Sequence, residues 1–156
     1  MIDKYKCSDC KDGYRIFIKG DYVFPLAGLN YTIHDAEYFE CDVCHARSLG
    51  ARLVEKINDI ELEEARKVLN LILKNGFAHT KSISFLQEIS GTKDVDLVHK
   101  LKISKSTISN WDKRNTVLPY YLSILLAGIF AHKLKMNDIE SIVQDNIHSM
   151  LMSKVS

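Results

Sequence analysis

The sequence predicts an α+β protein in which a small β-rich N-terminal domain precedes an all-helical domain. Up to about Gly50 the chain alternates β-forming residues with turn residues, whereas from Arg52 onward apolar residues recur at three- and four-residue steps. All four cysteines lie in the first part. The length of 156 residues suits one ordinary domain or two small ones. Apolar and charged fractions of 46% and 26% exclude a disordered or collagen-like chain.

The N-terminal part is expected to form short strands separated by turns at Gly13, Gly20-Asp21 and Gly28. The expected strands include Tyr14–Lys19, Tyr22–Phe24, Tyr31–Ile33 and Glu37–Glu40. Strands of this length bury little apolar surface, and folds of about 40–50 residues usually need a cross-link or a metal.

The cysteines form two CxxC pairs, Cys7/Cys10 and Cys41/Cys44. A CxxC turn points both thiolates the same way, so two such turns can complete a tetrahedral four-sulfur zinc site. The opening segment lacks the apolar core of a signal peptide, so we expect a cytoplasmic chain with reduced thiols. One structural Zn²⁺ per chain in a zinc-ribbon-like domain is therefore favoured over disulfides or free thiols. A thioredoxin-like redox pair is not favoured, because its CxxC lies in a βαβ pattern that this sequence lacks. The segment Cys-Asp-Val-Cys-His matches a haem-attachment motif, but covalent haem attachment would require export of the chain.

The helical part begins with an amphipathic segment at Glu61–Asn75, for which Gly76 offers a C-cap. Further helices are expected at about Ile83–Ser90, Asp94–Leu101, Ser104–Lys113, Pro119–Leu134 and Asn137–Ser153. The predicted organisation is a zinc-binding β domain over 1–50, a linker and first helix over 51–80, and a helix-turn-helix domain for DNA binding and dimerisation over 81–156. The longest apolar run, Tyr120–Ala131, is too short to span a membrane.

The segment around Asp94–Lys113 has the apolar spacing of a helix-turn-helix. Ile108 and Trp111 would form the buried face of the second helix, with Ser104 as its N-cap. The other face would present short polar side chains and cations, which suit base edges and phosphates. These candidate DNA-binding residues are Lys105, Ser106, Thr107, Ser109, Asn110, Lys113 and Arg114.

Net charge alone argues against a nucleic-acid partner, because it is only +1 over the whole chain. Residues 81–130, however, carry seven Lys/Arg against four Asp/Glu, and residues 1–50 carry six against eight. DNA binding needs only a local basic face, and residues 81–130 supply one although the whole chain is nearly neutral. The alternative is an ordinary amphipathic helix pair with a solvated charged face.

Residues Ile83–Asp112 align without a gap to the helix-turn-helix of the Cro/Xre repressor class, and the segment Ser-Lys-Ser-Thr-Ile-Ser-Asn-Trp-Asp at 104–112 resembles its end closely. With the two CxxC pairs, about residues 5–130 resemble the MqsA (YgiT-type) antitoxin family. The resemblance implies a toxin-neutralising zinc domain joined to a dimeric DNA-binding domain, with Ser106 and Asn110 reading bases. The chain departs from the class at Asp94, where Gln is common, and at Lys102, where Gly is common.

The resemblance leads us to expect a cytoplasmic, nucleoid-associated repressor that acts as a type II toxin–antitoxin antitoxin and regulates its own operon. Its partners would be double-stranded DNA with a palindromic operator, a small toxin protein and a second copy of itself, with no membrane partner. The alternative is a zinc-containing Xre-type transcriptional regulator with no toxin partner. An enzyme is not expected, because the six histidines are scattered and no Gly-rich phosphate loop is present.

A homodimer is expected through the last two helices. Residues 119–134 are apolar on more than one face, and residues 137–153 carry an apolar stripe at three- and four-residue steps. A small helical domain can cover one such stripe itself, and a second more often marks a partner surface. The alternative is that the last helix packs back onto its own domain as a lid.

Overall fold

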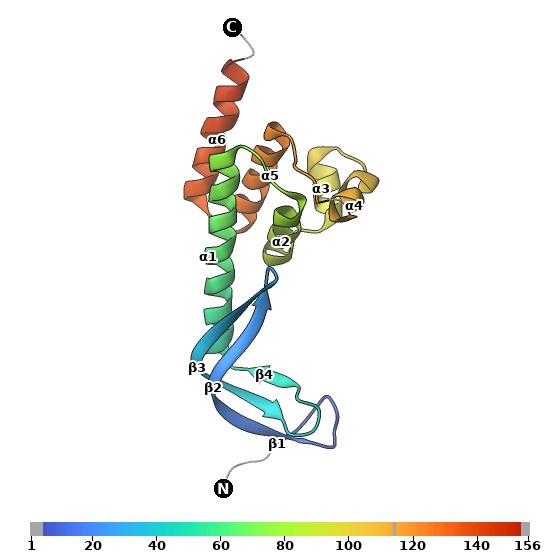
Figure 1. The fold of residues 1–156 in the computed structure, drawn as a ribbon, viewed down its shortest axis with the longest axis vertical. Coiled ribbons are helices and arrows are strands. Elements are labelled where there is room, and N and C mark those ends of the chain that lie inside the picture. The colour runs from blue at the N-terminus through green and yellow to red at the C-terminus, as the bar shows by residue number, and fades with distance from the viewer. Residues whose placement is uncertain (1–4, 114, 154–156) are drawn as a thin grey trace. The chain divides into compact units, whose positions relative to one another are not determined.

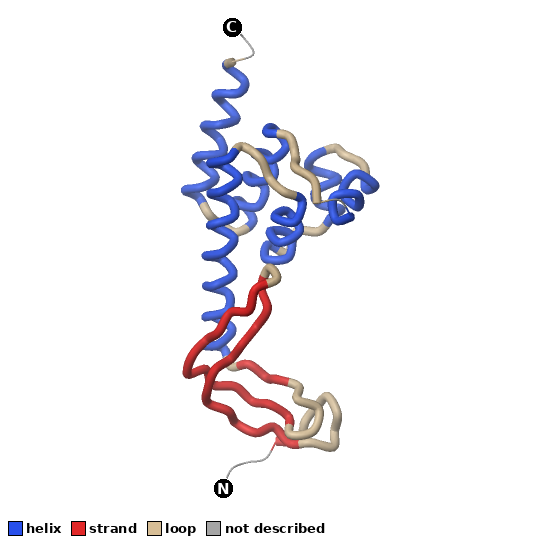
Figure 2. Tube along the Cα trace, viewed as in Figure 1, coloured by secondary structure: helices blue, strands red, loops and turns tan. Residues whose placement is uncertain are grey.

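The computed structural model describes residues 5–113 and 115–153, and it confirms the α+β class. Figures 1 and 2 show that the strands precede the helices along the chain. The four strands are β1 (Tyr5–Lys6), β2 (Tyr14–Leu26), β3 (Leu29–Cys41) and β4 (Arg47–Leu49). They form one antiparallel sheet in the order β1-β2-β3-β4.

The sheet is built around one long hairpin rather than several short strands. β2 and β3 are 13 residues each and pair from Arg15↔Cys41 to Leu26↔Leu29. The expected turn at Gly20-Asp21 is wrong: the register shifts between Gly20 and Tyr22, so this position is a β-bulge. From the Gly20↔Ala36 pair to the Tyr22↔Ile33 pair, β2 advances two residues and β3 advances three, so the extra residue lies on β3, where Asp35 has a φ of 52°. The bulge lets both strands continue past Gly20-Asp21.

The hairpin reverses where the sequence predicts it, at Ala27-Gly28, which have φ of 52° and 78°. Positive φ at both central residues is the backbone of a type I′ turn, whose twist matches that of the strands. The buried apolar side chains of the N-terminal part lie at alternate positions within each strand, except between Ile33 and Ala36, and include one residue of the first helix: Phe24, Leu26, Ile33, Ala36, Tyr38 and Leu53.

The first helix, α1 (Ala51–Asn75), begins ten residues earlier than the expected start at Glu61. Leu53, Ile57 and Ile60 already recur at helical spacing, so residues 51–60 continue the apolar stripe that the sequence shows after Glu61. The chain divides into two compact units, Met1–Glu61 and Leu62–Ser156, and the division falls inside this helix. The helix ends at Gly76, whose φ is 74° and whose N–H donates to the Ile72 carbonyl.

The remaining helices lie close to their expected bounds. They are α2 (Thr80–Ser90), α3 (Asp94–Leu101), α4 (Lys105–Lys113), α5 (Tyr120–Lys133) and α6 (Asn137–Met152). Their core consists of fully buried side chains from every helix of the unit: Leu69, Ile83, Leu86, Leu97, Ile108, Ile124, Leu126, Phe130 and Ile139. Of the helices in the described residues, none is both long and apolar enough to cross a membrane.

A buried serine joins the starts of α2 and α5. The Ser123 hydroxyl donates to the Pro119 carbonyl at 3.0 Å and accepts the Ala78 N–H at 2.9 Å. Beside it, the Leu118 N–H donates to the Ala78 carbonyl. These bonds pair the Ala78 N–H and the Leu118 N–H of two buried residues, so they hold the segment before α2 against the segment before α5.

Candidate metal centre and candidate nucleic-acid interface

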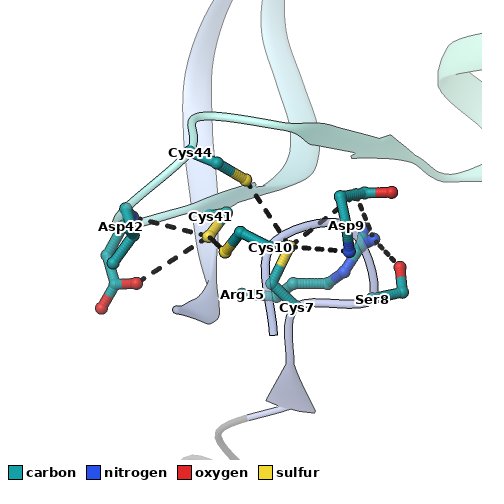
Figure 3. A network of polar contacts seen from close by, with 9 residues as sticks. Cys7, Ser8, Asp9, Cys10, Arg15, Cys41, Asp42 and Cys44 are labelled. Carbon is teal, nitrogen blue, oxygen red and sulfur yellow. Dashed lines mark hydrogen bonds and ion pairs between the residues drawn. The ribbon is translucent and has the colours of Figure 1, made fainter. Parts of the chain in front are cut away.

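The two CxxC segments occupy equivalent positions at the ends of strands. Cys7 follows β1 directly, and Cys41 is the last residue of β3. Because β1 and β3 both pair with the start of β2, the sheet brings the two segments to one end. Figure 3 shows the four sulfur atoms pointing toward a common centre.

The two segments also share one local backbone conformation. The Asp9 and Val43 N–H groups donate to Cys7 Sγ and Cys41 Sγ at 3.4 and 3.5 Å. The residue after each second cysteine, Lys11 or His45, has positive φ and donates its N–H back to the carbonyl of the first cysteine. N–H···S bonds of this kind stabilise negative charge on sulfur, so each turn is preformed for thiolates.

The spacing of the sulfur atoms fits a tetrahedral metal. All four lie within 4.8 Å of one another, and the pairs Cys7–Cys44 and Cys10–Cys41 are both 3.7 Å apart. A tetrahedron with Zn–S bonds of ~2.3 Å has edges of about 3.8 Å. Disulfide sulfurs would lie at about 2.05 Å, and all four cysteines are free. In the described part of the chain this is the one cluster with metal-ligand spacing.

A glycine that the sequence marks only as a turn allows the two CxxC segments to meet. A Cβ on Gly13 would lie 2.4 Å from Cys41 Sγ and 2.8 Å from Asp42 Oδ1. The Asp42 carboxylate accepts the Tyr14 N–H at 2.7 Å, and the Asp42 N–H donates to the Tyr14 carbonyl at 3.1 Å. Only a residue without a side chain fits between these groups, so Gly13 is a positioning residue that sequence analysis missed.

Without a cation the four thiols oppose ionisation of one another. A backbone hydrogen bond from Ala46 lowers the pKa of Cys44, but desolvation and the thiols of Cys41, Cys10 and Cys7 outweigh it and raise that pKa to about 12. A divalent cation supplies positive charge that favours the ionised thiolates over the neutral thiols, since metals bind thiolates.

Nearby, Arg15 donates to Ser8 Oγ at 2.9 Å and to Asp9 Oδ2 at 3.3 Å, which ties down the first CxxC turn. Four sulfur ligands suit zinc and leave no open coordination position, so the site can hold an ion but offers no place for a substrate.

The second candidate site is the α3–turn–α4 helix pair. As predicted, Ile108 and Trp111 of α4 are buried, and Leu97 of α3 is buried as well. Ser104 caps α4, because its Oγ accepts the Thr107 N–H at 3.2 Å. Five of the seven candidate DNA-binding residues are exposed, Lys105, Ser106, Thr107, Asn110 and Lys113, while Ser109 is half-buried and Arg114 lies outside the described residues.

The hydroxyl groups of Ser106 and Thr107 on α4 form hydrogen bonds with the N-cap residue of the same helix. Ser104 Oγ shares hydrogen bonds of 2.8 Å with both Ser106 Oγ and Thr107 Oγ1. The Asn110 side chain is exposed and takes no part in this cap. Its amide is thus the polar group on this face that is most available for a base edge.

The two departures from the repressor pattern both have structural explanations. Asp94 Oδ1 accepts the side-chain N–H of Gln87 at 2.9 Å, which joins α2 to the start of α3. Lys102 adopts φ 53° and ψ 37°, the left-handed conformation that glycine usually takes in this turn. The turn is therefore retained, at the cost of backbone strain of order 1 kcal/mol.

No family model, curated protein or solved structure matches this chain.

Proposed function

We propose that the protein is a DNA-binding transcriptional repressor that uses α3 and α4 as a helix-turn-helix. One observation carries this proposal: α4 buries Ile108 and Trp111 on one side and exposes Lys105, Asn110 and Lys113 on the other. A helix anchored on one face with polar and cationic groups on the other fits a major groove. Lys100 and Lys102 are also exposed beside it, so the local field favours phosphate.

In this proposal the four cysteines hold one structural zinc ion. The ion supplies a cross-link between the two CxxC turns and takes part in no reaction. Cys7, Cys10, Cys41 and Cys44 would bind it as thiolates, with Gly13, Asp42 and Arg15 positioning the turns that carry them.

The antitoxin role is the finer part of the proposal, and its support is the resemblance to the MqsA (YgiT-type) family. The order of the parts, a four-cysteine sheet followed by helices, agrees with that family's organisation. The alternative is an Xre-type regulator with no toxin partner, acting in the cytoplasm on the same kind of operator. Expression of the chain with its neighbouring genes separates the two: the antitoxin role requires a small protein that co-purifies at fixed stoichiometry. Purification alone from an intact operon favours the plain regulator.

DNA binding is tested by fluorescence anisotropy with the DNA upstream of the chain's own gene and with random DNA of equal length. Lys105→Ala should weaken binding to both and lower the salt slope by ~0.9 for each phosphate that is no longer neutralised. Asn110→Ala should cost about 1–3 kcal/mol on the operator alone, since it removes a hydrogen bond to a base. Lys133→Ala, an exposed cation at the end of α5, is the matched control. If Asn110→Ala weakens binding to the operator and to random DNA equally, α4 is not the reading helix.

A further inference from the structure

The four cysteine thiols differ in how accessible they are to an oxidant. Cys7 and Cys41, the first cysteine of each CxxC turn, are 2% and 1% exposed. Cys10 is half-buried, whereas Cys44 is exposed and lies in a run, residues 42–45, that is exposed throughout. An oxidant in solvent must touch the sulfur that it oxidises, so Cys44 is the thiol most open to reaction.

Two close sulfur contacts connect the first CxxC turn to the second. Cys7 Sγ lies 3.7 Å from Cys44 Sγ, and Cys10 Sγ lies 3.7 Å from Cys41 Sγ, as the dashed lines in Figure 3 show. The two contacts use each cysteine once. Because the sulfurs of a disulfide are about 2.05 Å apart, each pair closes with an approach of about 1.7 Å. Both disulfides can therefore form in one chain.

We propose that this cluster is an oxidation site at which hydrogen peroxide exchanges the zinc ion for two disulfides, Cys7–Cys44 and Cys10–Cys41. The proposal rests on the structural zinc inferred above and is independent of DNA binding. Both disulfides run from the first turn to the second, so the turns stay cross-linked when the ion leaves. Oxidation thus removes the metal and leaves the sheet folded, whereas a chelator removes the ion and puts no bond in its place.

Each disulfide forms in two steps, with hydrogen peroxide as the oxidant. The Cys44 thiolate attacks a peroxide oxygen, the O–O bond breaks, and hydroxide leaves, which gives a sulfenic acid on Cys44. The Cys7 thiolate then attacks that sulfur, an S–S bond forms, the S–O bond breaks, and a second hydroxide leaves. The two sulfurs lose two electrons, which the peroxide gains. The same steps join Cys10 to Cys41, so two peroxides release one Zn²⁺ and four hydroxides.

The position of the second thiol stops the oxidation at the disulfide. A sulfenic acid with no thiol in reach goes on to sulfinic and sulfonic acids, which dithiols do not reduce. Here the attacking sulfurs are held in place, because the Asp9 N–H donates to Cys7 Sγ at 3.4 Å and the Val43 N–H to Cys41 Sγ at 3.5 Å. An attack between groups already in contact is fast. A dithiol, oxidised once for each disulfide, and added zinc should restore the original site.

The test is peptide mapping of the full zinc-loaded chain after about two equivalents of hydrogen peroxide, with remaining thiols blocked by N-ethylmaleimide. An aspartate lies between the cysteines of each pair, so cleavage before aspartate puts every cysteine on its own peptide: 3–8, 9–11, 35–41 and 42–58. Peptide 3–8 should be linked to 42–58, and 9–11 to 35–41. Any other main set of links, or four thiols that stay free, would overturn the proposal.

Two further samples test the order of reaction and the role of the fold. Dimedone, which traps sulfenic acids, should label peptide 42–58 before the other three when it is added with the peroxide. Earlier labelling of another peptide would contradict the assignment to Cys44. A chain stripped by a chelator before oxidation is the control, and it should give more links within a turn, since a short loop closes at lower entropic cost. Identical maps would mean that the zinc-bound arrangement does not direct the pairing.

Hydrogen–deuterium exchange by mass spectrometry then distinguishes exchange of the metal from its simple loss. Residues 5–49 should keep their protection after peroxide and exchange roughly 10-fold faster or more after the chelator. Equal loss of protection after both treatments would overturn the claim that the disulfides replace the ion. Zinc is measured in the fresh chain before either treatment. A fresh chain without zinc would refute the proposed metal, and its peptide map would still test the pairing of the cysteines.

Discussion

Gly13 limits the geometry of the candidate metal centre. The turn after the first CxxC pair passes so close to the second pair that a methyl group would overlap Cys41 Sγ. Cysteine spacing predicts the ligands because a CxxC turn is a local structure. The need for glycine arises from contact with residues about thirty positions away, which no local pattern reveals.

Gly13→Ala should weaken zinc binding about 10–100-fold, as changes in residues that orient metal ligands commonly do. The added Cβ must displace either Cys41 Sγ or the Asp42 carboxylate from its place. Competition with a chromogenic chelator measures the affinity. Gly20→Ala is the matched control, because a Cβ there meets no atom within 4 Å. Equal affinities for the two variants would show that the turn adapts at no cost to zinc binding.

Six described non-glycine residues have positive φ, and three of them matter to the candidate sites. Lys11 and His45 end the two CxxC turns, and Lys102 ends α3. Lys102 can be identified from the sequence through its place in the repressor pattern, where glycine is common. Lys11 and His45 cannot, because neither residue type is as strong a signal for this conformation as glycine.

At the scale of elements, helix positions are more predictable from this sequence than strand lengths. The bounds of α3 agree with the sequence, those of α4 and α6 differ by one residue at one end, those of α5 differ by one residue at each end, and α2 begins three residues earlier than expected. Apolar spacing and caps are local, so they mark helix ends well. The length of the β2–β3 hairpin depends on pairing between strands, and the bulge near Gly20 is a feature of that pairing.

An ion pair between Arg66 and Asp138 links α1 to α6 within the C-terminal unit. The hydrogen bond from the Arg66 guanidinium holds the pKa of Asp138 below its ordinary value of 3.8. A carboxyl with a lowered pKa in the fold contributes stability above its unfolded pKa, and this contribution disappears as the pH falls through the folded pKa.

Asp138→Asn should therefore lower the urea midpoint of the helical transition at pH 7. The difference from wild type should hold down to about pH 4 and then shrink with further acidification, because both chains then lack the charge. Both side chains are substantially exposed, so the effect is small and decreases with added salt. Asp145→Asn, also on α6, is the control. A difference that grows on acidification would contradict this assignment.

At the scale of the whole molecule, the two units differ in what stabilises them. The helical unit has a core of large buried side chains, whereas the sheet buries few and has the four-cysteine cluster at its end. The short apolar segments before Gly50 predict this contrast. The sequence does not predict that α1 extends on both sides of the division at Glu61, because the first ten residues of this helix are interpreted there as a linker.

Cys10→Ser, or removal of the metal with a chelator, should unfold the sheet and leave α2–α6 folded. Hydrogen–deuterium exchange by mass spectrometry should show fast exchange over residues 5–49 and unchanged protection in the helices. Metal analysis of the fresh wild-type chain should give one zinc per chain. Mild acidification should have the same effect as the chelator, since protons compete for the thiolates. Loss of protection in both units would mean that they do not fold separately.

The CxxC pairs also determine the connectivity of the folded chain. Cys7 and Cys44 are 37 positions apart and their sulfurs nearly touch. With an ion bound, the intervening chain is a closed ring, whose formation removes about 4 kcal/mol of configurational freedom from the unfolded chain on the loop-entropy account. Cutting the backbone at the hairpin tip between Ala27 and Gly28 would open the ring without separating the pieces. The two fragments would remain joined by metal–sulfur bonds and by the paired strands, as a complementing pair.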